Sequence, residues 1–110
     1  MNNSGCVNKV ILAGKITEDP YWLDGGKNKW LCFKLLTTEK RSSAKGETVQ
    51  EELHQIKVHE NCPSLSKIQL QVNDIIYLQG KIQTTAFVDG DNHKRYKTDV
   101  IANSIDQWEI

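Results

Sequence analysis

The stretch from Val7 to Pro20, VNKVILAGKITEDP, most constrains how this 110-residue chain can fold. Its apolar residues form a nearly continuous run, which Gly14 interrupts and Asp19-Pro20 ends. A strand that is apolar on both faces must be covered on both faces, which places it in a barrel or at a subunit contact. A glycine inside such a strand is typical of a bend, so we expect Gly14 to mark a corner of a small barrel.

Four later segments alternate between apolar and polar residues, which predicts four more strands. They are residues 30–38, 52–59, 75–85 and 96–105. In the first of them Leu31 and Phe33 point one way, whereas Trp30 points the other. In the third, Gly80 lies on the apolar face and predicts a second bend.

The segments between these strands differ in character. Residues 22–28 and 89–92 contain the Asp-Gly sequences that are typical of hairpin turns. Residues 40–48, KRSSAKGET, are polar and basic without a period, so we expect a mobile loop. Residues 61–72 place Pro63 in a first turn, followed by apolar residues near helical spacing, which predicts one short helix.

The predicted order is therefore three strands, a helix and two strands in a single domain, residues 1–110, with its core at about residues 7–105. This is an all-β class, and the order is that of the five-stranded oligonucleotide/oligosaccharide-binding (OB) barrel with one short helix between strands 3 and 4. Other small barrels and an open sheet share the same order.

The chain carries 14 basic and 14 acidic residues, so its formal net charge is zero. This balance argues against a simple nucleic-acid assignment, because such domains are often basic overall. The basic residues are nevertheless concentrated between positions 27 and 45.

Other functional classes find little support. Cys6, Cys32 and Cys62 form no CxxC pair, so we expect reduced thiols and no metal site. No nucleophile and base, paired carboxylates or phosphate loop occur in a suitable pattern, so we predict that the protein is not an enzyme and needs no cofactor. The polar start and the lack of a long apolar run predict a cytoplasmic protein with no membrane contact.

The chain resembles the bacterial and mitochondrial single-stranded DNA-binding protein family. The opening stretch follows that family's V-N-K-V-x-L-x-G-x-x-x-x-D-P pattern almost letter for letter. Further matches are LLTTE at residues 35–39, KGE at 45–47, His54, IYLQGKIQT at 76–84 and DGDNHKRYKTDV at 89–100. The resemblance implies an OB barrel, a dimer or homotetramer, and binding of single-stranded DNA without strong sequence preference.

The resemblance also implies stacking and phosphate-binding residues. The family's base-stacking aromatics fall on Arg41, Leu53, His59 and Phe87 here, and Leu53 offers only an apolar contact. The resemblance implies base stacking by Arg41, His59 and Phe87, and we add Trp30 to this set because strand alternation places it away from the core. Lys34, Lys57 and Lys81 lie on the non-core side of three strands and would form a phosphate track if aligned. The full predicted phosphate-binding set is Lys9, Lys34, Lys40, Lys57, Lys81, Lys94 and Arg95.

For self-association we predict a subunit interface at Val7, Ile11, His54 and Tyr77. The sequence stops at Ile110, so we expect a tail-less family member that lacks the acidic tip through which relatives recruit partners. Three functional hypotheses remain open. The first is single-stranded DNA binding in replication, recombination or repair. The second is a replication-restart primosomal protein with replication or restart partners, and the third is a protein–protein module that has lost DNA binding.

Overall fold

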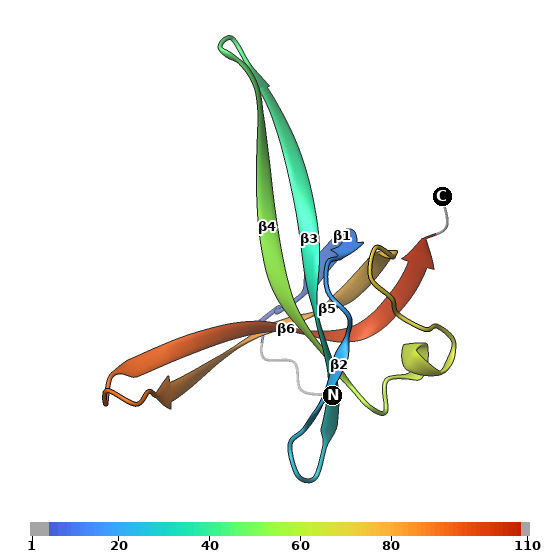
Figure 1. Cartoon of the computed structure of the whole chain (residues 1–110), viewed down its shortest axis with the longest axis vertical. Helices are drawn as coiled ribbons and strands as arrows, with labels where there is room; N and C mark the ends of the chain where they lie inside the picture. The colour runs from blue at the N-terminus through green and yellow to red at the C-terminus, as the bar shows by residue number, and fades with distance from the viewer. Residues whose placement is uncertain (1–4, 109–110) are drawn as a thin grey trace.

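The computed structural model describes residues 5–108, and within that range the chain forms six strands and one short 3₁₀ turn (Figure 1). The molecule measures about 50 × 40 × 35 Å. The elements are β1 (Val10–Ile16), β2 (Tyr21–Asp24), β3 (Lys29–Ser43), β4 (Gly46–His59), the 3₁₀ turn η1 (Pro63–Ser66), β5 (Ile75–Val88) and β6 (Lys94–Trp108).

Five of these strands close into a barrel. The strand order is β1-β5-β6-β4-β3-β2, and β1 pairs a second time with β3 through Lys15↔Leu36 and Ile16↔Leu35. All pairings are antiparallel except that of β4 with β6, which runs parallel over three residue pairs. The predicted five-stranded OB barrel is confirmed, and the short strand β2 is an addition to it on β3.

The barrel interior is filled by side chains that alternate along the strands, as the sequence pattern predicts. Each barrel strand contributes at least one of them. The buried cluster consists of Ile16, Leu31, Phe33, Leu35, Ile56, Val58, Ile76, Leu78, Val100, Ala102 and Ile105.

Two glycines mark the barrel corners, as predicted. A Cβ atom at Gly14 would overlap the backbone carbonyl of Leu36, where β1 changes its partner from β5 to β3. A Cβ atom at Gly80 would overlap the carbonyl of Ile101, and the β5–β6 register shifts between Gln79 and Gly80. Only a residue without a side chain allows the backbones to approach this closely.

The helix predicted at residues 61–72 is wrong in extent, because only the single turn η1 forms there. Leu65 is partly buried against the core from this turn, and Ile68 and Leu70 reach the core from irregular backbone after it. The Ser64 hydroxyl accepts a hydrogen bond from the Ile105 backbone N–H at 3.0 Å. The Asn73 N–H donates to the Ile16 carbonyl at 2.8 Å. These tertiary contacts fix an irregular segment across the barrel end, and they override a weak helical pattern.

The loop predicted at residues 40–48 is also wrong. β3 continues to Ser43 and β4 starts at Gly46, so the segment is the end of a two-stranded ribbon. Arg41 pairs with Thr48 and Lys40 with Val49 in a regular ladder. Both faces of the ribbon meet solvent, so its side chains are polar on both sides and show no period of burial.

Three further boundaries differ from the predictions. The opening strand is shorter than the apolar run, and it leaves the outward side chain of Ile11 53% exposed. The turn predicted at residues 22–28 is confined to residues 25–28, because β2 precedes it. β6 extends past both predicted ends.

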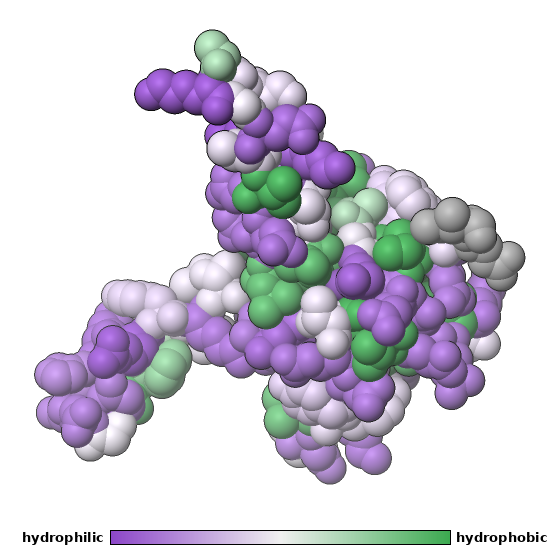
Figure 2. Space-filling view, turned by 45° about the horizontal axis from the view of Figure 1, so that its top comes forward, coloured by the Kyte–Doolittle hydropathy of each residue, from purple (hydrophilic) through white to green (hydrophobic). Residues whose placement is uncertain are grey.

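Two ribbon arms project from the barrel in different directions, one from β3–β4 and one from β5–β6 (Figure 1). Hydrophilic side chains cover most of both arms (Figure 2). Residues 5–108 contain no helix that is long and apolar enough to cross a membrane.

Candidate nucleic-acid interface

The side chains that point away from the core on four neighbouring strands form one surface, which we call the outer face. Strand alternation and register define it, because residues directly opposite each other on paired strands point to the same side. Its members are Trp30, Cys32, Lys34 and Leu36 on β3; Leu53, Gln55, Lys57 and His59 on β4; Arg95, Lys97, Asp99 and Ile101 on β6; and Lys81, Gln83, Thr85 and Phe87 on β5.

Trp30 and His59 meet at one end of the outer face. They are directly paired across β3 and β4, and their rings contact edge to face with centroids 5.1 Å apart. The Asn61 backbone N–H donates to His59 Nδ1 at 3.1 Å, so His59 Nε2 carries the proton that it donates to Asn28 Oδ1 at 3.0 Å. Both ring nitrogens are therefore engaged, and the imidazole is held in one orientation.

A shallow pocket of about 330 Å³ opens beside this ring pair. Trp30 and His59 line one part of it, and the side of Ile101 lines another. The amides of Asn61 and Asn103 also lie at the pocket. An apolar pocket with two half-buried rings and a few polar groups at its rim suits a planar heterocyclic ligand such as a nucleobase.

Lysines cross the middle of the outer face. Lys57 on β4 and Lys81 on β5 both pair with Ile101 on β6, so they flank it in a single row. Lys34 pairs with Gln55 one row further along β3 and β4. The three lysines predicted from strand parity therefore share one face, although whether they bind phosphate stays a prediction.

Several of the cations already lie beside carboxylates. Lys57 Nζ is 3.6 Å from Asp99 Oδ2, and Lys34 Nζ is 3.7 Å from Glu18 Oε1. The predicted stacking residue Arg41 lies 3.6 Å from Glu39. The Arg95 guanidinium donates to Asp89 Oδ2 at 2.8 Å, and this contact together with the hairpin's backbone N–H donors lowers the pKa of the Asp89 carboxyl.

Burial also affects the centre of this face. Cys32 sits opposite Lys57, and desolvation raises the pKa of its thiol, while the ammonium groups of Lys57 and Lys97 partly offset that rise. A raised pKa keeps the thiol protonated and unreactive near neutral pH.

The remaining predicted contacts are spread along the arms. Phe87 lies on the outer face near the end of the β5–β6 arm, opposite Arg95, and is 47% exposed. Lys40 lies on the same side of its ribbon as Lys34. By alternation Arg41 lies on the opposite side, about 36 Å along β3 from Trp30. Lys94 alternates to the side away from Arg95, and Lys9 is exposed just before β1.

The model of the single-strand binding protein family matches residues 7–108 of this chain. The chain belongs to that family. A protein named single-stranded DNA-binding protein from Neisseria meningitidis is 28% identical over 101 residues, covering 90% of this chain and 58% of the relative. One from Bacteroides thetaiotaomicron is 30% identical over 105 residues, covering 91% of this chain and 65% of the relative. The chain thus spans about three fifths of the length of the curated relatives it matches.

Solved structures of family members share the fold. A Plasmodium falciparum SSB in complex with ssDNA aligns with a TM-score of 0.81 at 23% identity, covering 99% of this chain and 100% of that one. A small single-stranded DNA-binding protein from Streptomyces coelicolor aligns with a TM-score of 0.67 at 17% identity, covering 90% of this chain and 92% of that one.

The residues predicted for the subunit interface lie before β1, on β1, on the first half of β5 and on the core side of β4. Ile11 and Tyr77 occupy neighbouring rows on the outward side of β1 and β5, and Tyr77 stacks on Trp108 with centroids 5.8 Å apart. Val7 precedes β1 and is 88% exposed. His54 lies on the core side of β4, where its Nε2 and the Thr37 hydroxyl are 2.8 Å apart, so its ring is already hydrogen-bonded within the chain.

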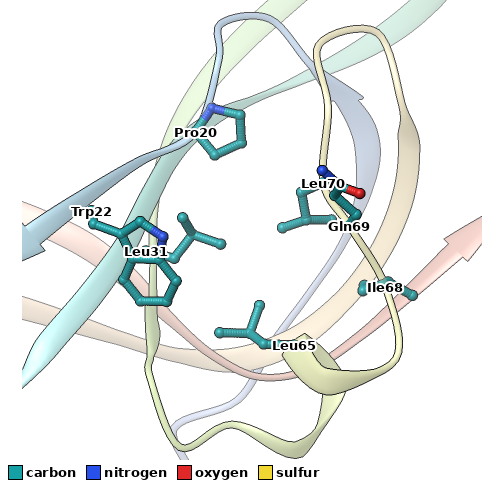
Figure 3. A pocket seen from close by; sticks show the side chains of 7 residues that line it. All are labelled: Pro20, Trp22, Leu31, Leu65, Ile68, Gln69 and Leu70. Atoms are coloured by element: carbon teal, nitrogen blue, oxygen red, sulfur yellow. The ribbon is translucent and has the colours of Figure 1, made fainter.

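A second pocket of about 260 Å³ lies at the barrel end between β2, β3 and the segment after η1. Figure 3 shows Pro20, Leu31, Leu65 and Leu70 arranged around its opening, with the Trp22 ring at the rim. Its apolar lining offers no charge complementary to phosphate.

At the tip of the β5–β6 arm, Asp89, Asp91 and His93 bring three potential metal-ligand atoms within 4.8 Å of one another. Asp89 Oδ1 already accepts hydrogen bonds from the backbone N–H groups of Asp91 and His93, and Asp89 Oδ2 accepts from Arg95. These bonds form the hairpin turn itself, and this accounts for the cluster without a metal.

Sequence reasoning missed four residues at the interface: Asn28, Asn61, Lys97 and Asp99. Strand alternation does place Lys97 and Asp99 on one side of β6. Their closeness to Lys57 depends on the parallel β4–β6 register, which no local pattern reveals. The Asn28 contact likewise joins residues 31 positions apart.

Proposed function

We propose that this chain is a non-catalytic protein that binds single-stranded DNA without strong sequence preference and acts in DNA replication, recombination or repair. The outer face carries the strand. Bases stack at Trp30, His59 and, further out, Phe87, while lysines on the same face contact the phosphates. Arg41 contributes where the strand passes around the β3–β4 ribbon.

The observation that carries this proposal is the edge-to-face pair of Trp30 and His59 in the row next to Lys57 and Lys81. Stacking on aromatic rings tolerates any base, and cations recognise the backbone common to all sequences. Family membership and the names of the matched relatives support the same ligand.

Self-association is part of the proposal. The outward side of β1 and of the first half of β5 exposes Ile11 and the Tyr77–Trp108 stack, and along β5 Tyr77 lies on the far side of Lys81 from Phe87. A dimer or homotetramer formed there leaves each outer face open to DNA. We place the protein in the cytoplasm, associated with the nucleoid.

The experiment is a titration of the full chain with dT oligonucleotides at two salt concentrations, followed by tryptophan fluorescence. Stacking at Trp30 should quench the fluorescence. If about four to six cations contact phosphates, log K should fall with log salt with a slope of about −0.7 per contact. The absence of binding at low salt, or an affinity independent of salt, contradicts the proposal.

A specific observation favours a second function. Lys34, Lys57 and Arg95 each lie within 4 Å of a carboxylate, and the net charge is zero, which weakens the field available to a polyanion. A protein–protein module on the same barrel fits this charge pattern, and so does a replication-restart primosomal protein. Tight dT binding argues against the module, whereas co-purification with a helicase favours the primosomal role.

A further inference from the structure

One buried carboxylate stands out on the outer face. Asp99 is 4% exposed, and no group in residues 5–108 donates a hydrogen bond to its buried Oδ1 atom. Two ammonium groups lie near it: Lys57 Nζ is 3.6 Å from Oδ2 and Lys97 Nζ is 3.9 Å from Oδ1. Burying a carboxylate removes its hydration, and ion pairs of this length without hydrogen bonds compensate only part of that cost.

The position of Asp99 is as unusual as its burial. By alternation its side chain points away from the core, and it lies opposite Gln83 of β5, one row from the Lys57–Ile101–Lys81 row. It is therefore a negative charge near the centre of the surface proposed to bind a polyanion. With Lys57 and Lys97 it forms a group of net charge +1, where the lysines alone would provide +2.

The two lysines differ from Asp99 in their access to solvent. The side chain of Lys57 is 25% exposed and that of Lys97 is 50% exposed, against 6% for Asp99. Each lysine has a flexible four-carbon stem that can extend its ammonium group toward solvent. A phosphate arriving at the outer face can thus reach both ammonium groups while the carboxylate stays beneath them.

We propose that Asp99 is a positioning residue that holds Lys57 and Lys97 at the centre of the free outer face and competes with DNA phosphates for them. This inference rests on the proposed function. Binding exchanges a carboxylate for a phosphate at each lysine, so less free energy is gained than two unpaired lysines would provide. Asp99 thereby limits affinity and favours release of the strand.

The first test compares Asp99→Asn with Asp106→Asn in the full chain. Asp106 is exposed on the same strand, seven residues away, so both variants change the charge equally. Removing a charge about 6 Å from a phosphate should tighten dT binding about threefold or more at low salt. The log–log salt slope should steepen by about 0.7 for each lysine released. Asp106→Asn should stay within about twofold of the unmodified chain.

A second pair of variants keeps the inference testable if Asp99→Asn does not fold. Lys97→Gln should weaken dT binding less than Lys81→Gln, because Lys97 already lies beside Asp99, whereas no ion pair of Lys81 is found within residues 5–108. In the Asp99→Asn background, Lys97→Gln should remove most of the gain, which a double-mutant cycle measures.

Provided that the unmodified chain binds dT, two results overturn the inference. One is that Asp99→Asn binds dT no more tightly than Asp106→Asn. The other is that Lys97→Gln weakens dT binding as much as Lys81→Gln. If neither the unmodified chain nor Asp99→Asn binds dT at low salt, the proposed function fails together with the inference. The two failures are therefore distinguishable.

Discussion

The indole of Trp30 and the imidazole of His59 meet edge to face, with ring centroids 5.1 Å apart, at directly paired positions of β3 and β4. Asn28 and the Asn61 backbone hold the imidazole from its two nitrogens. The imidazole is therefore fixed before a ligand arrives and the indole packs against it, so little side-chain entropy is lost when a base stacks on the pair.

Trp30→Ala should weaken dT binding by about 1–3 kcal/mol, or about 5- to 150-fold in Kd, because a stacking platform is lost. Binding is measured by fluorescence anisotropy of a labelled oligonucleotide. Trp22→Ala is the matched control, since Trp22 lies at the rim of the apolar pocket at the barrel end. Equal losses from the two variants would show that Trp30 has no special role.

Leu53→Trp should tighten dT binding about fivefold or more. Leu53 lies on the outer face and is 52% exposed. A new indole there adds about 1 kcal/mol or more of stacking. Thr98→Trp is the control, because Thr98 is exposed on the β5–β6 arm and points away from the outer face. If both variants gain equally, the position of Leu53 has no special role in stacking.

Gly80→Ala should destabilise the fold by about 3 kcal/mol or more, because the added methyl group overlaps the Ile101 backbone at the barrel corner. Urea unfolding measures the change. Gly90→Ala, where the methyl group meets no atom within 4 Å, should change stability by less than about 1 kcal/mol. A Gly80→Ala protein as stable as Gly90→Ala would contradict the corner described for β5.

Arg95→Gln should raise the pKa of Asp89 toward its ordinary value, because the Arg95 guanidinium is the main cause of the lowering. A carboxyl with a lowered pKa in the folded state contributes stability above its unfolded pKa of about 3.9. That contribution is lost as the pH falls through the lower, folded value. An NMR titration of the Asp89 carboxyl checks the shift, and an unchanged midpoint in Arg95→Gln would show that the backbone donors alone cause it.

The sequence predicted the faces of the strands better than their ends. Alternation around Leu31, Ile56 and Val100 is local, so it could be read without knowing which strands pair. The length of the ribbon beyond Lys40 could not be read from the sequence, because a two-stranded ribbon in solvent buries neither face and so shows no alternation of apolar and polar residues. The expected helix failed since Leu65 and Ile68 reach the core by crossing the barrel end rather than by forming one helical side.

In the candidate site too, features set by local alternation could be predicted, whereas contacts set by strand pairing could not. Parity placed Trp30, Lys57 and Lys81 on the non-core sides of their strands, and the strand pairing brings the three onto one surface. The Lys57–Asp99 ion pair joins residues 42 positions apart through a parallel pairing of only three residue pairs. Such a contact depends on how the barrel closes, so charge counting along the sequence overestimated the cations that are free for DNA.

The most direct test of the outer face is ultraviolet cross-linking of the full chain to a dT oligonucleotide, followed by mass spectrometry of the cross-linked peptides. The account predicts cross-links at Trp30, His59 and Phe87, which lie on one surface but on three different strands. Tight binding with cross-links confined to β1, β2 or the Trp22 pocket would contradict it.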